Sequence, residues 1–217
     1  MNRRLCVICE GQTEARFTVT CLQPHLLTLG ILAYPAMLKT RPSRKGGGHV
    51  SVERVAKHIQ LEYAHSDAQT TLLDYYGFRD VQGRTKAQLE QAILEQASRL
   101  IQNFDPRFII PYIQIHEFEA LLFSDIEQFK WVVDGWDEKK KTRLQAVRAA
   151  FASPEDIDDG PDTAPSKRIL KIFNGGEYSK VEHGPLIAEA IGLSCIREHC
   201  RNFNAWLSRL EDLRDIP

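Results

Sequence analysis

Ile8-Cys9-Glu10-Gly11-Gln12-Thr13-Glu14 marks the change from a buried strand to a helix. The preceding residues, Leu5 to Cys9, are apolar without alternation, which is typical of a strand covered on both faces. Gly11 permits a tight turn, and Thr13 is suited to cap the helix that follows. The pattern therefore predicts an α/β fold with the Glu10 carboxylate at the carboxyl end of a central strand, where open α/β sheets bind their ligands.

The first half of the chain alternates between strand and helix patterns. Strands are predicted near 4–10, 32–38, 70–76 and 108–115, with helices near 14–29, 51–64 and 86–103. Strands separated by helices in this way indicate a parallel sheet with helical crossovers. We therefore expect an α/β, Rossmann-like core over residues 1–125.

After residue 115 the pattern becomes helical. Helices are predicted over 116–124, 139–151, 166–174, 184–191 and 202–213, and the acidic, proline-containing segment 153–165 is predicted to be a loop. We expect residues 126–217 to form a helical C-terminal extension packed on the core.

The amino-acid composition indicates a globular protein without an overall basic charge. The 217 residues are 43% hydrophobic and 26% charged, as in globular domains, and the net charge of −1 excludes a protein that is basic over its whole surface. Any nucleic-acid contact must then come from local patches. No apolar run approaches the roughly 20 residues needed to cross a bilayer, and the start lacks the apolar region of a signal peptide.

The five cysteines do not suggest a metal site. Cys6 and Cys9 form a CxxC, but they lie inside the predicted strand, where alternation points them to opposite faces. They are interpreted as buried free thiols of a cytoplasmic protein.

Acidic residues follow more than one of the predicted strands. Asp74 ends an apolar run and precedes Tyr75-Tyr76-Gly77, as Glu10 precedes Gly11, and the fourth strand runs into His116-Glu117-Phe118-Glu119. Because parallel strands deliver their carboxyl ends to one edge of a sheet, we expect these acids to meet there. Oxygen ligands favour Mg²⁺ or Mn²⁺ over zinc. The predicted metal ligands are Glu10, Glu14, Asp74, Glu117 and Glu119.

Structural alternatives exist for each residue. Acids commonly cap helices, Asp74 is also suited to an Asx turn, and His116 is as well explained by backbone hydrogen bonds. Glu117 and Glu119 diverge by about 200° around a helix, so only one of them is expected to reach the site.

The sequence resembles a known family at these positions. Glu10-Gly11-Gln12-Thr13-Glu14 followed by an acidic strand end is similar to the Toprim fold of topoisomerases, primases and OLD-family nucleases. The segments 73–77, 116–125 (HEFEALLFSD) and 164–168 (APSKR), with Cys200 and Phe203 to Trp206, resemble the bacterial domain-of-unknown-function family number 4276. The resemblance covers nearly the whole chain, and the HEFEALLF string is its most distinctive part.

The resemblance implies metal-dependent phosphodiester chemistry on DNA or RNA, by a protein that works with an ABC- or OLD-type ATPase in phage-defence modules. Glu10 matches the Toprim glutamate, Glu14 its companion in OLD-like proteins, and Asp74 the first acid of the DxD motif. The second DxD position holds Tyr76, a neutral phenol and a poor ligand for magnesium. Either Glu117 or Glu119 takes that place, or one metal site is weakened.

Phosphoryl chemistry also needs cations beyond the metal. The glycine-rich loop at 41–49 and the start of the helix near 166 are candidates, against the alternative of solvated surface. The candidates for phosphate contact are Arg41, Arg44, Lys45, Lys167 and Arg168. Lys167 and Lys180 are candidates to balance charge in the reaction, and Glu14 and His116 are candidates for a general base.

Two functions follow from this sequence. The first is a nuclease gated by an ATPase partner. The second is a degenerate Toprim scaffold that binds and regulates the ATPase. A nucleotide-binding Rossmann protein is less well supported, because no GxGxxG or Walker-type loop is present.

Overall fold

The computed structural model describes residues 2–38, 50–79, 81–158 and 163–216, in two compact units. Unit 1 is Met1–Gln114 together with Trp206–Pro217, and unit 2 is Ile115–Ala205. The division therefore falls before the expected boundary at residue 125, and the last segment of the chain returns to the first unit.

Unit 1 is built on a parallel sheet. Its strands are β1 (Arg3–Cys9), β2 (Ile31–Met37), β3 (Ala68–Asp74), β4 (Ile109–Ile110) and β5 (Ile113–Gln114). The order is β2-β1-β3-β4, with β5 also paired to β3, and every pairing is parallel. The predicted α/β fold class, a parallel sheet flanked by helices, is confirmed.

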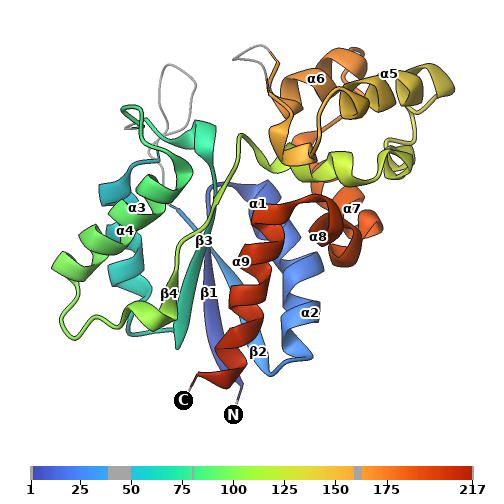
Figure 1. Ribbon diagram of the computed structural model, residues 1–217. Helices are drawn as coiled ribbons and strands as arrows, with labels where there is room; N and C mark the ends of the chain where they lie inside the picture. The colour runs from blue at the N-terminus through green and yellow to red at the C-terminus, as the bar shows by residue number, and fades with distance from the viewer. Residues whose placement is uncertain (1, 39–49, 80, 159–162, 217) are drawn as a thin grey trace. The chain divides into compact units, whose positions relative to one another are not determined.

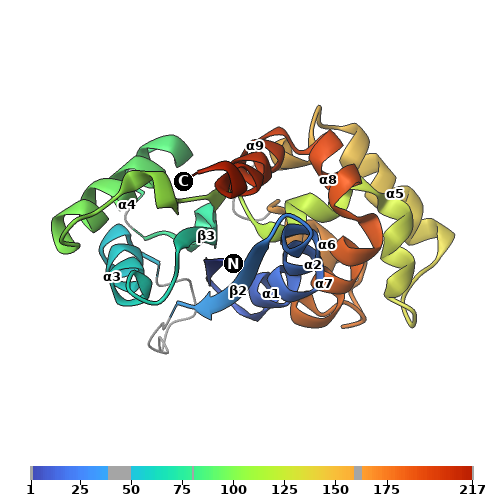
Figure 2. The same cartoon turned by 90° about the horizontal axis from the view of Figure 1, so that it is seen from below.

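Helices cover both faces of this sheet. They are α1 (Gln12–Phe17), a π-helical turn (Thr18–Leu22), α2 (Gln23–Leu27), α3 (Val52–Glu62), α4 (Lys86–Leu100) and the part of α9 (Arg201–Glu211) that follows Ala205. Figure 1 shows α3 and α4 on one face, with α1, α2 and α9 on the other, and Figure 2 shows the same division from below.

Local sequence explains where these helices begin. The Ser51 side chain accepts a hydrogen bond from the Arg54 amide, so it caps α3. At the first helix the prediction is wrong, because Gly11 occupies the N-cap and Thr13 lies buried inside α1. The N-cap needs extended backbone, which Gly11 adopts with φ −144° and ψ −172°.

One apolar core lies between the sheet and α3 with α4. Cys6 and Ile8 of β1 and Leu73 of β3 pack there against apolar residues of both helices, such as Ile59 and Ile93. Uninterrupted burial of β1 from Leu5 to Cys9 matches the apolar run in the sequence.

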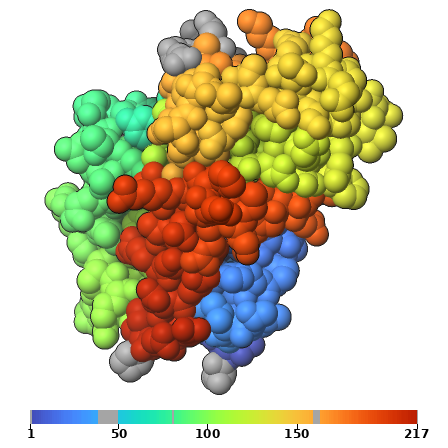
Figure 3. Space-filling view, turned by 45° about the vertical axis from the view of Figure 1, so that its right-hand side comes forward, coloured from blue at the N-terminus to red at the C-terminus, as the bar shows by residue number. Residues whose placement is uncertain are grey.

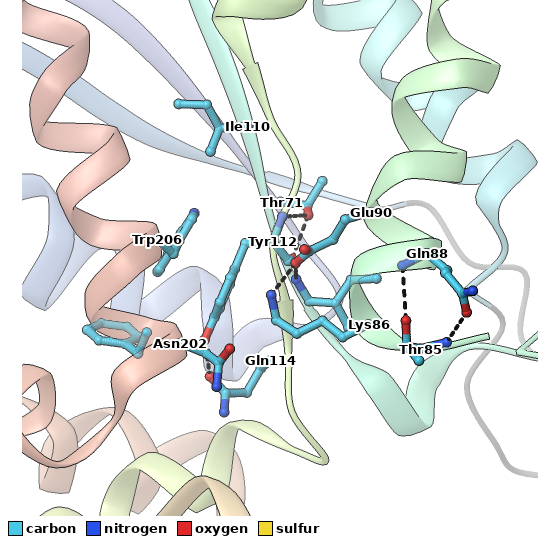
Figure 4. A network of polar contacts seen from close by, with 12 residues as sticks. Thr71, Thr85, Lys86, Gln88, Glu90, Ile110, Tyr112, Gln114, Asn202 and Trp206 are labelled. Carbon is cyan, nitrogen blue, oxygen red and sulfur yellow. Dashed lines mark hydrogen bonds and ion pairs between the residues drawn. The ribbon is translucent and has the colours of Figure 1, made fainter. Parts of the chain in front are cut away.

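The fourth predicted strand is broken into β4 and β5 by Pro111, which has no amide hydrogen for the ladder. Two buried hydroxyl groups of β3 replace the missing pairs, and Figure 4 shows one of them, Thr71, beside Tyr112. Thr70 donates to the Ile110 carbonyl at 2.6 Å. Thr71 donates to the Tyr112 carbonyl at 2.6 Å and accepts from the Tyr112 amide at 2.8 Å.

Two side chains of helix α4 contact the residues that follow Pro111. The Glu90 carboxylate accepts a hydrogen bond from the Ile113 amide at 2.9 Å and pairs with Lys86, whose ammonium lies 4.6 Å from the Tyr112 ring centre. The Tyr112 hydroxyl donates to Gln114 at 2.6 Å. Every polar group named at the break therefore has a partner, as buried polar groups require.

The end of the chain completes unit 1. The Trp206 ring stacks on Tyr112 with centroids 4.4 Å apart, and its indole N–H donates to the Thr70 hydroxyl at 2.8 Å. Further along α9, Glu211 pairs with His25 of α2 at 2.7 Å. Figure 3 shows these last residues, in red, beside blue α2 on the surface.

Unit 2 is helical in its described residues. Among the residues that the structure describes, it contains α5 (Glu138–Ala149), α6 (Pro165–Ile172), α7 (Lys180–Ile191), α8 (Leu193–His199) and three 3-10 segments: Phe118–Ser124, Ile126–Trp131 and Pro154–Asp156. The predicted helix at 116–124 is thus a 3-10 segment, and α8 was not predicted.

The prediction that the cysteines are free thiols is confirmed. All five cysteines are free, and all but Cys195 are buried. In the described part of the chain, no helix combines the length and apolarity that crossing a bilayer requires.

Candidate functional site

The carboxyl ends of β1 and β3 bring two acids together in unit 1. Glu10 follows β1 directly, and Asp74 is the last residue of β3. The pairing of the two strands places Cys9 opposite Leu72, and the Glu10 amide donates to the Leu72 carbonyl at 3.4 Å. The Glu10 carboxylate in turn accepts a hydrogen bond from the Asp74 amide at 3.3 Å. These two predicted site residues are therefore neighbours.

Gly77 makes room for the Glu10 carboxylate. A Cβ atom at Gly77 would lie 2.8 Å from the Glu10 Cδ atom, closer than real Cβ contacts allow. The backbone of the turn after β3 thus forms one wall of the place where Glu10 sits. A side chain at residue 77 would push that carboxylate away from the sheet edge.

Glu14 has a structural contact as well as a place near the strand end. It lies in the first turn of α1, is 6% exposed, and accepts a hydrogen bond from the Gly11 amide at 2.9 Å. A carboxylate at this position satisfies an amide that the helix leaves unpaired and interacts favourably with the helix dipole. It also adds a second negative charge to the segment that carries Glu10.

Glu117 and Glu119 belong to unit 2, where both face one lysine. Lys180 Nζ lies 3.3 Å from Glu119 Oε1 and 3.8 Å from Glu117 Oε1. Glu117 also accepts a hydrogen bond from the Ser166 amide, in the first turn of α6, at 3.0 Å. The side chain of Glu119 is 2% exposed, so a positive partner is needed to offset the cost of its burial.

Tyr178 lies close enough to Glu117 and Glu119 to be affected by their negative charge. Its ring is buried, and its pKa is raised well above 10, first by burial and then by the negative charges of Glu119 and Glu117. The ring lies against His183, with centroids 5.8 Å apart. The Tyr178 phenol is therefore neutral at physiological pH and stands in a negative environment.

His116, near the start of unit 2, has an unusual backbone conformation. Its φ of 62° lies in the left-handed region, which is uncommon for residues other than glycine. Its Nδ1 atom lies 3.6 Å from the Asp158 carboxylate. That distance is a charge contact when the ring is protonated and is longer than a hydrogen bond.

The predicted cations differ in their surroundings. Arg168 donates to the Thr163 carbonyl at 2.6 Å and lies over the Phe151 ring, so it joins parts of unit 2. Lys167 is exposed. Ser166 does open a helix as predicted, and the anion at its amide is Glu117. Arg41, Arg44 and Lys45 lie outside the described residues.

Sequence reasoning missed a group of cations in unit 1. A cavity of about 390 Å³ is lined by Arg54 and Lys57 of α3 and by Arg79, which follows the turn after β3. These residues are isolated along the chain, so no run of basic residues signals them. Only the pairing of Val50 with Phe78 brings them together.

The unit 1 acids suit a hard divalent cation. Among the described residues, no three His, Cys, Asp or Glu side chains are grouped for a metal. Glu10 and Asp74 nevertheless end neighbouring strands at one edge, where the Asp74 amide bonds the Glu10 carboxylate and Gly77 leaves that carboxylate room. Magnesium is commonly bound through one or two carboxylates while it keeps several waters. Two acids at this edge are enough in number to bind an ion in that way.

Comparisons place the fold among known proteins. A family model described as "Domain of unknown function (DUF4276)" matches residues 9–211. The C-terminal region of the Xanthomonas campestris pv. campestris OLD protein, phased with platinum, has a TM-score of 0.51 at 14% identity, over 99% of this chain and 94% of that chain. The same region phased with iodine gives 0.49 at 14% identity, over 99% and 97%. Comparison with curated proteins found no match. The likeness to the first structure is one of fold.

Proposed function

This chain belongs to the DUF4276 family, and we propose that it is a Mg²⁺- or Mn²⁺-dependent, Toprim-like nuclease that hydrolyses phosphodiester bonds in DNA or RNA. The observation that carries the proposal is the hydrogen bond from the Asp74 amide to the Glu10 carboxylate at 3.3 Å. It joins the two strand ends at the edge where parallel α/β sheets bind ligands. The OLD-like fold supports the same reading.

Each acid has a distinct part in this proposal. Glu10 and Asp74 would hold the ion, which when bound supplies positive charge to a phosphoryl oxygen and an activated water near neutral pH. The Asp74 amide and the Gly77 backbone fix the Glu10 carboxylate. Glu14, anchored by the Gly11 amide, keeps the turn between β1 and α1 in place.

In unit 2, we propose that Glu117 and Glu119 hold the Lys180 ammonium where it can contact a phosphate group. Glu117 and Glu119 keep the Lys180 ammonium in position, and its side chain is still 40% exposed. An ammonium held in this way can offset charge that develops on a phosphate. Lys167 and His116 stay candidates for positioning and proton transfer in the same unit.

A partner is part of the proposal. The similar structure is the C-terminal region of an OLD protein, and the resemblance of the sequence to OLD-family nucleases implies an ATPase that works with this chain. We propose an ABC- or OLD-type ATPase as the partner, in a bacterial defence module. A protein with a net charge of −1 would gain localisation on nucleic acid from such a partner.

A second candidate function is a regulatory scaffold with weak or no catalysis. Tyr76 stands where the resemblance implies a second acid, and it is 42% exposed. Glu117 and Glu119, the acids that could replace it, already contact Lys180. In this case the chain binds and regulates the ATPase.

The two functions are separated by a cleavage assay. The purified protein is incubated with end-labelled DNA and RNA in Mg²⁺, Mn²⁺ or EDTA, with and without an ABC- or OLD-type ATPase from the same genome. If the chain is a nuclease, we expect metal-dependent cleavage. Its rate should fall at least 100-fold in Glu10→Gln and in Asp74→Asn, but should persist in the exposed control Glu95→Gln. Absence of cleavage under every condition, with the ATPase bound, supports the scaffold instead.

A further inference from the structure

The cation-lined cavity of unit 1 is separate from the acids but begins beside them. Val50 donates its amide to the Gly77 carbonyl at 3.2 Å, and the Arg79 amide donates to the Val50 carbonyl at 3.1 Å. The segment before α3 is thus held against the turn that follows β3. Gly77 faces the Glu10 carboxylate on one side, and the residues bonded to it line the cavity on the other.

The lining has the chemistry of an anion site. Of the described residues, the charged ones that line it are Arg54, Lys57, Arg79 and Glu53, and the Glu53 carboxylate pairs with Lys57 at 2.7 Å. The Lys57 contact lowers the pKa of Glu53, so the pair stays charged at neutral pH. The side chains of the two arginines come from different elements, α3 and the segment after β3.

The volume of the cavity and its lining residues indicate which kind of anion it can bind. A cavity of about 390 Å³ lies within the range of about 300–1,000 Å³ that is typical of ligand clefts. The described residues of its lining include no aromatic side chain on which a base would stack. Guanidinium groups form paired hydrogen bonds with phosphate oxygens, and contacts of this kind position a nucleic acid without reading its bases.

We propose that this cavity binds the phosphodiester backbone of the nucleic acid next to the phosphate that is cleaved, with Arg54 and Arg79 as the principal contacts. The inference rests on the proposed function, because it assigns the substrate's path across unit 1. Binding here is sequence-independent and leads the backbone from α3 past Gly77 to the acids at the strand ends.

The test measures binding without cleavage. Fluorescein-labelled 20-mers of DNA and RNA, single- and double-stranded, are titrated in EDTA with full-length protein, and anisotropy is followed from 50 to 250 mM salt. Arg54→Ala/Arg79→Ala is expected to weaken binding at least tenfold. For duplex DNA it should reduce the slope of log K against log salt by about 2, since each phosphate contact contributes about 0.9.

Matched variants control for net charge and for folding. Arg99→Ala/Lys139→Ala removes the same charge from exposed positions elsewhere and should bind as the wild type does. Arg54→Lys/Arg79→Lys should retain most of the salt slope. Circular dichroism confirms that each variant is folded.

The proposal is overturned by no binding of the 20-mers to the wild type, by an unchanged slope in the arginine variant, or by an equal loss of binding in the control pair. Displacement of the 20-mer by equimolar AMP also overturns it, since the cavity would then be a mononucleotide site. A loss of binding in the arginine variant, with no cleavage by the wild type in any metal, upholds the backbone site and rejects the nuclease. Cleavage that is unaffected by the arginine variant rejects the site alone.

Discussion

The backbone amide of Asp74 donates to the side-chain carboxylate of Glu10 across 3.3 Å, so a side chain links the ends of β1 and β3 beyond their strand pairing. The position of Glu10 is thereby tied to the backbone of the neighbouring strand. Changes that move this carboxylate should affect function before they affect the fold.

Gly77→Ala tests this dependence. The new methyl group would meet the Glu10 carboxylate, so we expect a loss of metal-dependent cleavage of at least tenfold and a loss of stability of about 1–3 kcal/mol from overpacking. Cleavage assays and urea unfolding measure the two effects. Gly83→Ala is the control: its φ of 75° makes it strained, but no atom lies within 4 Å of its Cβ. Stability should fall there with activity retained, and equal losses of activity would contradict the prediction.

Lys180→Met tests the buried charge of Glu119. Removing the ammonium leaves a carboxylate that is 2% exposed without its lysine, and we expect unfolding free energy to fall by about 1–3 kcal/mol, below the value for fully buried pairs because Lys180 is 40% exposed. Adding Glu119→Gln should restore part of that loss. Urea unfolding measures all three proteins, with Lys167→Met as an exposed control. Strict additivity in the double variant would show that the two side chains do not interact.

Thr70→Val tests the hydroxyl that joins β3 to β4 and α9. The substitution leaves the Trp206 indole N–H and the Ile110 carbonyl without this partner, which should cost about 2–4 kcal/mol because both groups are buried. Tryptophan fluorescence and chemical unfolding provide the measurement. The hydroxyl of Thr142 is on an exposed helix face, so Thr142→Val should change stability by no more than about 0.5 kcal/mol.

Cys200 gives a pH dependence with a definite sign. Burial raises the pKa of its thiol from 9.0 to about 12, so above pH 9 the unfolded chain loses the proton while the folded chain keeps it. Stability is therefore complete below pH 9 and falls as pH rises, by about 1.4 kcal/mol per unit for one thiol. Between pH 8 and 10, Cys200→Ala should lose about 1.4 kcal/mol less than the wild type in urea unfolding. An identical loss in both proteins would refute the assignment.

The features of this fold that could be predicted are those that depend on residues adjacent in the sequence. The unbroken apolar run of β1 and the acid after it placed Glu10 correctly, and the same logic placed Asp74. Parallel pairing then required the two ends to meet. The Ser51 cap was also readable, because capping depends on a few adjacent residues.

Features that depend on pairing between distant segments were not predictable. Pro111 interrupts the fourth strand, but only the hydroxyl groups of β3 show how the gap is filled. Arg54 and Arg79 become neighbours through the contact of Val50 with Phe78, which no periodicity encodes. Lys180 was predicted to serve the site, yet its contacts with both glutamates depend on the packing of unit 2.

Trp206 has a consequence for biosynthesis. The first 114 residues form most of unit 1, but the ring that stacks on Tyr112 arrives only after the whole of unit 2 has been made. Contacts between residues so far apart in sequence form slowly, because a long loop must close first. A nascent chain would therefore leave the ribosome with the Tyr112 face of its sheet uncovered, and synthesis must pass residue 206 before that sheet can mature.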